Sequence, residues 1–103
     1  MSVSIHFTRT AQMDLAEISA YLQLTFGEET AQKGVVSILE KIRLLGDFPS
    51  LGTPLPNSFA LKADYRLLNI QGNVVFYLVS KDGVEVLSIV SSKERFRSLF
   101  SHS

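Results

Sequence analysis

Apolar and polar residues alternate over the first seven positions of the chain. Val3, Ile5 and Phe7 share one side of this segment, and polar side chains occupy the other. A period of two predicts a half-buried strand. Thr8 or Thr10 then supplies a side-chain oxygen suited to capping the N-terminus of a helix.

Two helical stripes follow, separated by Gly27, a residue typical of a helix end. Glu28 and Glu29 open the second helix, where they complement the positive end of its dipole, and Gly46 ends it. Helices joined so closely form an antiparallel hairpin, and Gly34 favours their close approach. The predicted apolar stripes are Ala11, Leu15, Ile18 and Leu22 in the first helix, and Ala31, Val35, Ile38, Ile42 and Leu45 in the second.

Prolines and glycine interrupt the stretch 47–62, which excludes a long regular element there. The stretch is also too short and too apolar for a disordered linker. Four of its side chains are expected to pin it to the core: Phe48, Leu51, Leu55 and Phe59.

Three successive strands are predicted over residues 64–70, 73–80 and 83–91, with short turns that make them an antiparallel meander. The middle run is apolar without a break, which is typical of a central strand covered on both faces. Residues 93–100 form either a short terminal helix or an irregular segment. In the third strand, alternation predicts Val84, Val86 and Ser88 on one face and Glu85, Leu87 and Ile89 on the other.

The element order predicts one α+β domain over residues 1–103. We expect a small antiparallel sheet, made of an N-terminal strand and a three-strand meander, with the antiparallel helix hairpin packed on one face. The apolar positions are numerous for a chain of 103 residues. Either all of them belong to the core, or part of them stays exposed as a groove for a partner helix.

Composition removes several classes of function. Ten basic and ten acidic residues cancel, which argues against a general nucleic-acid-coating protein. The absence of cysteine excludes disulfides, thiolate zinc sites and cysteine nucleophiles. The longest apolar run, 74–79, is far shorter than the ~20 residues of a membrane helix, and the first residues do not resemble a signal peptide. We expect a cytoplasmic protein without metal or cofactor.

Few residues offer chemistry. His6 is either a general base or a surface histidine on the polar side of the first strand. Arg66, next to Tyr65, carries a fork of donors suited to phosphate or carboxylate, or else pairs with Glu85 or is solvated at an edge. Near the C-terminus, three cations lie close in sequence to aromatic residues: Lys93, Arg95 and Arg97. Either Phe96 and Phe100 stack on nucleic-acid bases while the cations contact phosphates, or the two rings pack the tail on the core and the cations are solvated.

The order of several short motifs resembles the RelE/ParE superfamily of toxins from bacterial type II toxin–antitoxin systems. The resemblance extends over about residues 3–100 and rests on the ordered set at the right spacing, because no single motif is specific. The motifs are Phe-Thr-Arg-Thr-Ala at 7–11, Asp-Leu at 14–15, Ile-Ser-Ala-Tyr-Leu at 18–22, Leu-Leu-Gly-Asp-Phe-Pro-Ser-Leu-Gly at 44–52, Tyr-Arg-Leu-Leu at 65–68, Val-Phe-Tyr at 75–77 and Val-Leu-Ser-Ile at 86–89.

The resemblance implies a growth-inhibiting toxin, associated with plasmid stabilisation, whose cognate antitoxin wraps over its sheet and helix hairpin. RelE-like members are metal-independent endoribonucleases that cut mRNA on the ribosome, and in that case Arg66, Lys93 and Arg95 are the catalytic candidates. ParE-like members poison DNA gyrase and need no catalytic set. A third alternative is a degenerate member that binds its antitoxin without being toxic.

Departures from the nuclease pattern favour the ParE-like branch. Leu68 and Val74 stand where the resemblance would place basic residues, and Phe100 stands where it would place a proton-transferring tyrosine or histidine. No acid–base pair is left for RNA cleavage. The resemblance therefore implies a gyrase inhibitor whose target-binding residues are Tyr65, Arg66, Lys93, Arg95 and Arg97.

Overall fold

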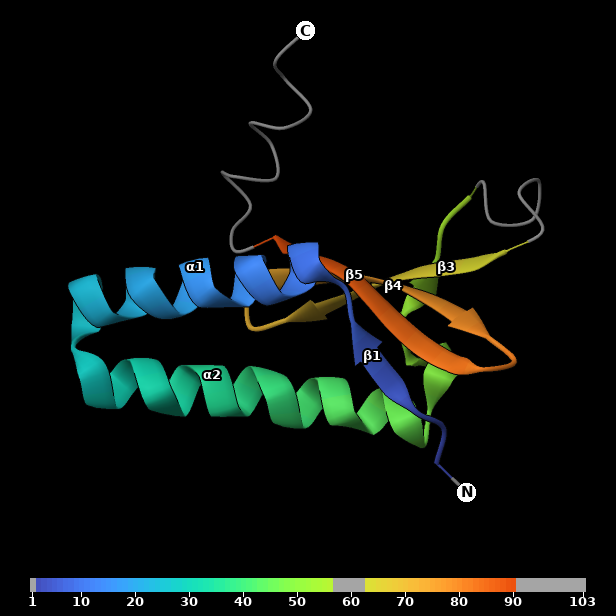
Figure 1. Cartoon of the computed structure of the whole chain (residues 1–103), viewed down its shortest axis with the longest axis horizontal. Coiled ribbons are helices and arrows are strands. Elements are labelled where there is room, and N and C mark those ends of the chain that lie inside the picture. Colours follow the sequence, from blue (N-terminus) through green and yellow to red (C-terminus); the bar gives the residue numbers. More distant parts are fainter. Residues whose placement is uncertain (1, 57–62, 91–103) are drawn as a thin grey trace, which may run out of the picture.

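The computed structural model describes residues 2–56 and 63–90. Within these ranges, two long helices form an antiparallel hairpin that lies beside a twisted sheet (Figure 1). This arrangement confirms the predicted α+β class. The elements are β1 (Ile5–Phe7), α1 (Arg9–Phe26), α2 (Glu28–Arg43), the short 3-10 helices η1 (Leu44–Gly46) and η2 (Pro49–Leu51), β2 (Thr53–Pro54), β3 (Asp64–Ile70), β4 (Asn73–Ser80) and β5 (Gly83–Val90).

The helix boundaries follow from local chemistry. The Thr8 side chain accepts a hydrogen bond from the Ala11 N–H and caps α1, which selects Thr8 over Thr10. Gly27 ends α1 at a φ of 95°, in a region that residues with a Cβ rarely adopt. A Cβ on Gly34 would lie 3.0 Å from Leu22 Cδ1, so the missing side chain does allow the helices to approach.

The strand order is β1-β5-β4-β3-β2, which makes β4 the central strand as predicted. The three pairs from β2 to β5 are antiparallel. The expectation of an antiparallel sheet does not extend to β1, which runs parallel to β5. A parallel pair needs a long connection, and the helix hairpin and the meander together supply it.

The helices cover one face of the sheet. Val75 and Tyr77 of β4 are fully buried on that face, whereas Val74, Phe76 and Leu78 on the opposite face are half-buried. The core is closed by the two predicted helix stripes, which face the same strands. Its buried members are Ala11, Ile18, Ile38, Ile42, Leu45, Ile70, Val75, Tyr77, Val84, Val86 and Ile89.

A β-bulge in β5 overturns the predicted alternation of that strand. Val86 pairs with Tyr77 and Ser88 with Phe76, so Leu87 is the extra residue. The bulge inverts the faces beyond it, and Ile89 joins the buried face instead of sharing the outer face with Glu85.

Side chains of the N-terminal segment hold the bulge. The Thr8 hydroxyl donates a hydrogen bond to the Leu87 carbonyl at 2.8 Å, and the Asp14 carboxylate accepts one from the Ile89 N–H at 2.9 Å. The Asp14 side chain of α1 thus accepts a hydrogen bond from the backbone of Ile89, a buried residue of β5. The Ile89 N–H therefore has an acceptor next to the bulge.

Removing the Asp14 carboxylate is expected to destabilise the fold. Asp14→Ala leaves the Ile89 N–H without its acceptor, which costs about 1.5 kcal/mol of unfolding free energy. Asp14→Asn keeps an oxygen acceptor and should lose less than half of that. Urea unfolding followed by far-UV circular dichroism measures both, and equal stability of Asp14→Ala and wild type would contradict this role.

The segment between α2 and β3 is held differently from the prediction. Phe48 and Leu51 were expected to pin it to the core, but their side chains are 59% and 50% exposed. Leu55 is half-buried, and Phe59 lies outside the described residues. Polar contacts to the backbone replace the expected apolar anchors, as the site geometry below makes clear.

Candidate partner-binding groove

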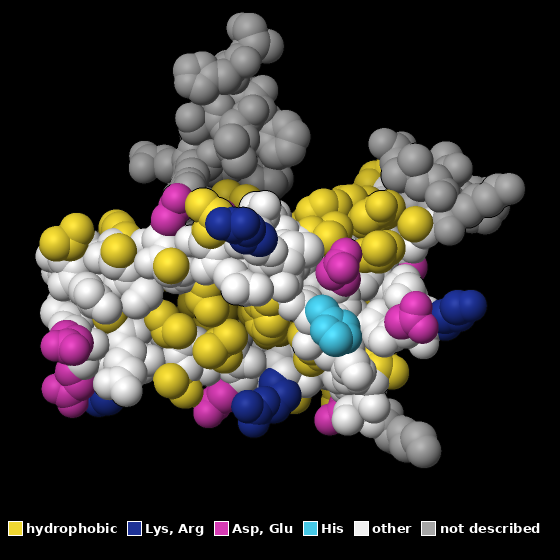
Figure 2. Space-filling view, in the orientation of Figure 1, with side chains coloured by type: hydrophobic (Ala, Val, Ile, Leu, Met, Phe, Trp, Pro, Cys, Tyr) yellow, Lys and Arg dark blue, Asp and Glu magenta, His cyan; other side chains and the backbone are white. Residues whose placement is uncertain are grey.

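Three adjoining cavities form a groove along the seam of the helix hairpin. Their volumes are about 320, 590 and 460 Å³ from the hairpin tip toward β1 and η1. The first and second share Ser19 and Val35 as lining residues, and the second and third share Ile5, Phe7 and Leu39. Figure 2 shows apolar side chains gathered in this hollow between the two helices.

The groove has an apolar middle and polar ends. Leu15 and Val35 line the middle together with the two apolar side chains of β1, while Glu28 lies at the tip and Arg43 and Asp47 at the other end. The wall formed by α2 has 16 residues, or about 24 Å of helix. These dimensions suit an amphipathic partner helix with anchors at i, i+3, i+4 and i+7.

His6 lies beside the groove rather than in a catalytic arrangement. Its side chain is exposed on β1 and lines the middle cavity together with Gln12. His6 pairs in register with the exposed Glu85 of β5. This position agrees with a surface histidine on the polar side of the strand.

Arg66 holds the loop between α2 and β3. Its Nη1 donates hydrogen bonds to the carbonyls of Ser50 at 3.1 Å and Gly52 at 2.8 Å, and its Nε binds the Asp64 carboxylate at 2.9 Å. The side chain is 17% exposed. Neither alternative stated for Arg66, a pair with Glu85 or a solvated edge position, describes this geometry.

Tyr77 is the second anchor of this loop. Its hydroxyl accepts a hydrogen bond from the Gly52 N–H at 2.7 Å and donates one to the Pro49 carbonyl at 2.8 Å. The side chain is fully buried. Burial raises the pKa of the Tyr77 phenol above its ordinary value, although the Gly52 N–H and the charge of Arg66 act in the opposite direction. The phenol is therefore a neutral structural group.

Tyr65 lies on the other face of the sheet from Arg66, because neighbouring strand residues point in opposite directions. Its half-buried ring stacks on Phe76, with centroids 5.6 Å apart and an interplanar angle of 25°. Tyr65 and Arg66 therefore do not converge on one site, and neither lines the groove. The remaining predicted site residues lie outside the described ranges: Lys93, Arg95 and Arg97.

Sequence reasoning missed two kinds of residue. Leu39 and Arg43 line the groove, yet Leu39 fell outside the predicted stripe and Arg43 was not among the predicted site residues. Leu39 follows Val35 by four residues, and this spacing was the signal for a second apolar edge on α2. Tyr77 interrupts a run without other hydroxyls, and a buried tyrosine hydroxyl needs a partner.

Within residues 2–56 and 63–90, no group of three or more histidine, aspartate or glutamate side chains could hold a metal ion. None of the helices in this part of the chain is long and apolar enough to span a membrane.

Comparisons with known proteins agree with the fold and the element order. The chain matches the family model described as the ParE toxin of the type II toxin–antitoxin system parDE over residues 5–96. A solved structure of the chromosomal ParDE TA system from P. aeruginosa has a similar chain, with 22% identity, a TM-score of 0.73 and coverage of 89% of this chain and 98% of that one. No curated protein matches the sequence. Because the family model extends over most of the chain, the protein belongs to the ParE toxin family of type II toxin–antitoxin systems.

Proposed function

We propose that this protein arrests bacterial growth by binding and inhibiting DNA gyrase, and that a cognate antitoxin neutralises it. The observation that carries the proposal is the match to the ParE toxin family over residues 5–96. Inhibition by binding needs a shaped surface rather than a set of proton-transferring groups.

The groove supports the antitoxin part of the proposal. It is apolar, open and as long as α2, and it lies on the helix hairpin, where the sequence resemblance places the antitoxin. The apolar surplus noted in the sequence is thus partly exposed rather than wholly used in the core. We propose that an apolar antitoxin segment fills this groove.

The target-binding surface is a separate part of the proposal. Tyr65 presents a half-buried ring on the face of the sheet that the helices leave uncovered. Arg66 contributes indirectly, since it fixes the neighbouring loop through hydrogen bonds to the Ser50 and Gly52 carbonyls, while Asp64 of its own strand holds its Nε. Lys93, Arg95 and Arg97 remain proposed contacts on the sequence alone.

The nuclease alternative receives no support from the described residues. Tyr77 is enclosed and hydrogen-bonded to the loop, and the Arg66 guanidinium is occupied by two carbonyls and a carboxylate. A ribonuclease needs an accessible base and acid beside the scissile phosphate. These two side chains serve the loop instead.

Induction of the protein without antitoxin in a bacterial host is expected to lower DNA synthesis within minutes, while protein synthesis continues. Separate pulse-labelling of DNA and protein measures this order. A supercoiling assay with purified gyrase and purified toxin should then show inhibition that rises with toxin concentration.

An early fall in protein synthesis would instead support the ribosome-dependent nuclease, and unaffected growth would support a degenerate, non-toxic member. The uninduced culture and induction of an equally expressed, unrelated protein of similar size are the controls. If purified toxin does not inhibit purified gyrase at any concentration, gyrase is not the target.

A further inference from the structure

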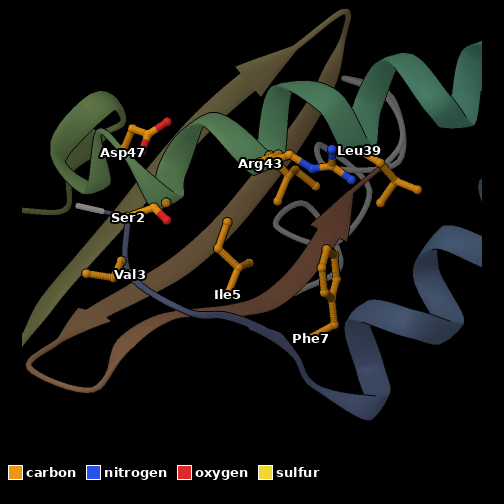
Figure 3. A pocket seen from close by; sticks show the side chains of 9 residues that line it. Ser2, Val3, Ile5, Phe7, Leu39, Arg43 and Asp47 are labelled. Atoms are coloured by element: carbon orange, nitrogen blue, oxygen red, sulfur yellow. The ribbon is translucent and has the colours of Figure 1, made fainter.

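The cavity at the Arg43 end of the groove combines apolar walls with one unpaired cation. Ile5, Phe7 and Leu39 line this cavity of about 460 Å³, and Arg43 extends from the last turn of α2 over it (Figure 3). The Arg43 side chain is exposed. Among the described residues it forms no ion pair and no side-chain hydrogen bond.

The other charged residue of this cavity is Asp47. Its carboxylate lies on the far side of the cavity from the Arg43 guanidinium, which reaches toward Leu39 (Figure 3). The apolar wall and the cation are thus neighbours, whereas the acid is separate. A guanidinium beside apolar groups binds a carboxylate through two parallel hydrogen bonds, and exclusion of water strengthens them.

We infer that Arg43 determines which partner the groove accepts, by pairing with a carboxylate that follows a large apolar anchor residue in the partner's helix. The inference rests on the proposed function, under which that partner is the antitoxin. The anchor fills the cavity formed by β1 and α2, and the carboxylate lies over the Arg43 guanidinium. A partner with a lysine or arginine at that place would face a like charge and be rejected.

The residues that line the groove indicate which charge the partner helix should carry near Arg43. The middle of the groove is lined mostly by apolar residues, together with His6, Gln12 and Ser19, and has no lysine, arginine, aspartate or glutamate among the described residues. It therefore distinguishes partners by shape more than by charge. Arg43 is the only lysine or arginine among the described residues that line the three cavities; Asp47 lies on the far side of its cavity, and Glu28 lies at the opposite end of the groove. A partner helix is therefore oriented with its acidic end toward Arg43.

A display library of 16-residue amphipathic helices tests the inference with the full chain as bait. The library keeps apolar residues at i, i+3, i+4 and i+7 and randomises the flanking positions. Peptides selected on the wild-type protein should carry aspartate or glutamate at one position beside a large apolar residue. Their affinity for Arg43→Glu should fall by roughly ten- to a hundredfold.

Lys41→Glu is the matched control, because it makes the same charge change two residues away at an exposed position that does not line the groove. Affinity for this variant should stay within about twofold. Leu39→Glu should abolish binding, which confirms that the peptides occupy the groove. Arg43→Gln serves as a second variant if Arg43→Glu does not fold, as judged by circular dichroism.

Peptides without an enriched acidic residue would overturn the inference, and so would equal affinity for wild type and Arg43→Glu. The inference would also be overturned if every selected peptide still bound Leu39→Glu, or if no peptide were selected. The selection does not depend on toxicity. Absence of growth arrest would therefore refute the proposed function, while the selection would still decide the role of Arg43.

Discussion

Replacement of Gly52 by alanine is expected to destabilise the folded protein strongly. An added Cβ would lie 2.7 Å from the Leu67 carbonyl oxygen, 2.7 Å from the Tyr77 hydroxyl and 2.9 Å from Tyr77 Cε1. The Leu67 carbonyl belongs to β3 and the Tyr77 ring is fully buried, so neither can move without disturbing the sheet. Overpacking of this kind, together with loss of the Gly52 N–H bond to Tyr77, costs about 3 kcal/mol.

Urea unfolding followed by far-UV circular dichroism measures this loss, since the chain has no tryptophan for fluorescence. Leu51→Ala is the matched control, because it changes the adjacent, half-exposed residue of the same loop and should alter stability by less than about 0.5 kcal/mol. A Gly52→Ala protein as stable as Leu51→Ala would show that the loop moves away from β3 easily. The tight packing at Gly52 would then contribute little to the fold.

Local patterns were sufficient for the two long helices, for β1 and β3 to β5, and for most of the core. They did not predict β2 or the 3-10 helices, and α2 ends at Arg43 rather than at the predicted Gly46. The stripes of α1 and α2 depend on a period of 3.6 residues, and helix geometry alone places Ile18, Ile38 and Ile42 on buried faces. The boundaries of β3 and β4 followed from turn residues, whereas β1 begins at Ile5, later than the predicted start of the strand. The predicted last residue of β5 lies outside the described residues. These features depend on residues close together in the sequence, and for that reason the pattern contains them.

Contacts between distant residues were not predictable in the same way. The β5 bulge depends on Asp14, which is 75 residues from its partner Ile89 along the chain. The parallel pairing of β1 with β5 depends on the path of the whole chain rather than on the alternation in either strand. Alternation predicts two faces for a strand, but an inserted residue exchanges them without any local signal.

The loop before β3 shows why apolar residues were assigned the wrong role. Phe48 and Leu51 resemble core residues in the sequence, yet they are largely exposed, while Arg66 and Tyr77 bind the loop backbone. A loop backbone carries carbonyls and N–H groups that need partners when they are enclosed. Polar side chains on the sheet satisfy them, which an apolar anchor cannot do.

The same contrast applies to the candidate site. Arg66 was selected as a candidate site residue, but its Nη1 hydrogen bonds are directed to the protein's own loop. The groove, by comparison, arises from what the two helices and β1 leave uncovered. Exposure of Leu39 and Arg43 depends on the angle and spacing of three elements, and no motif in the sequence specifies it.

Replacement of Tyr77 by phenylalanine is the second large expected effect. The ring is retained, so core packing changes little, but the Gly52 N–H and the Pro49 carbonyl both lose their partner. Each unpaired group costs about 1–3 kcal/mol when it is enclosed, so we expect a loss of about 2.5 kcal/mol. Tyr21→Phe is the matched control, since its side chain is 57% exposed and should change stability by less than about 0.5 kcal/mol.

The pH dependence of this loss distinguishes the contribution of the Tyr77 hydroxyl to stability from the contribution of its ring. Burial raises the pKa of Tyr77 above 10.0 in the folded protein, so the folded state favours the neutral phenol. The corresponding stability is fully present below about pH 10 and is lost as the pH rises through the folded pKa. The difference in unfolding free energy between wild type and Tyr77→Phe should therefore be constant at neutral pH and shrink above about pH 10. A difference that stays constant up to pH 11 would mean that the Tyr77 phenol ionises as easily in the folded chain as in the unfolded one, and that the loop does not enclose it.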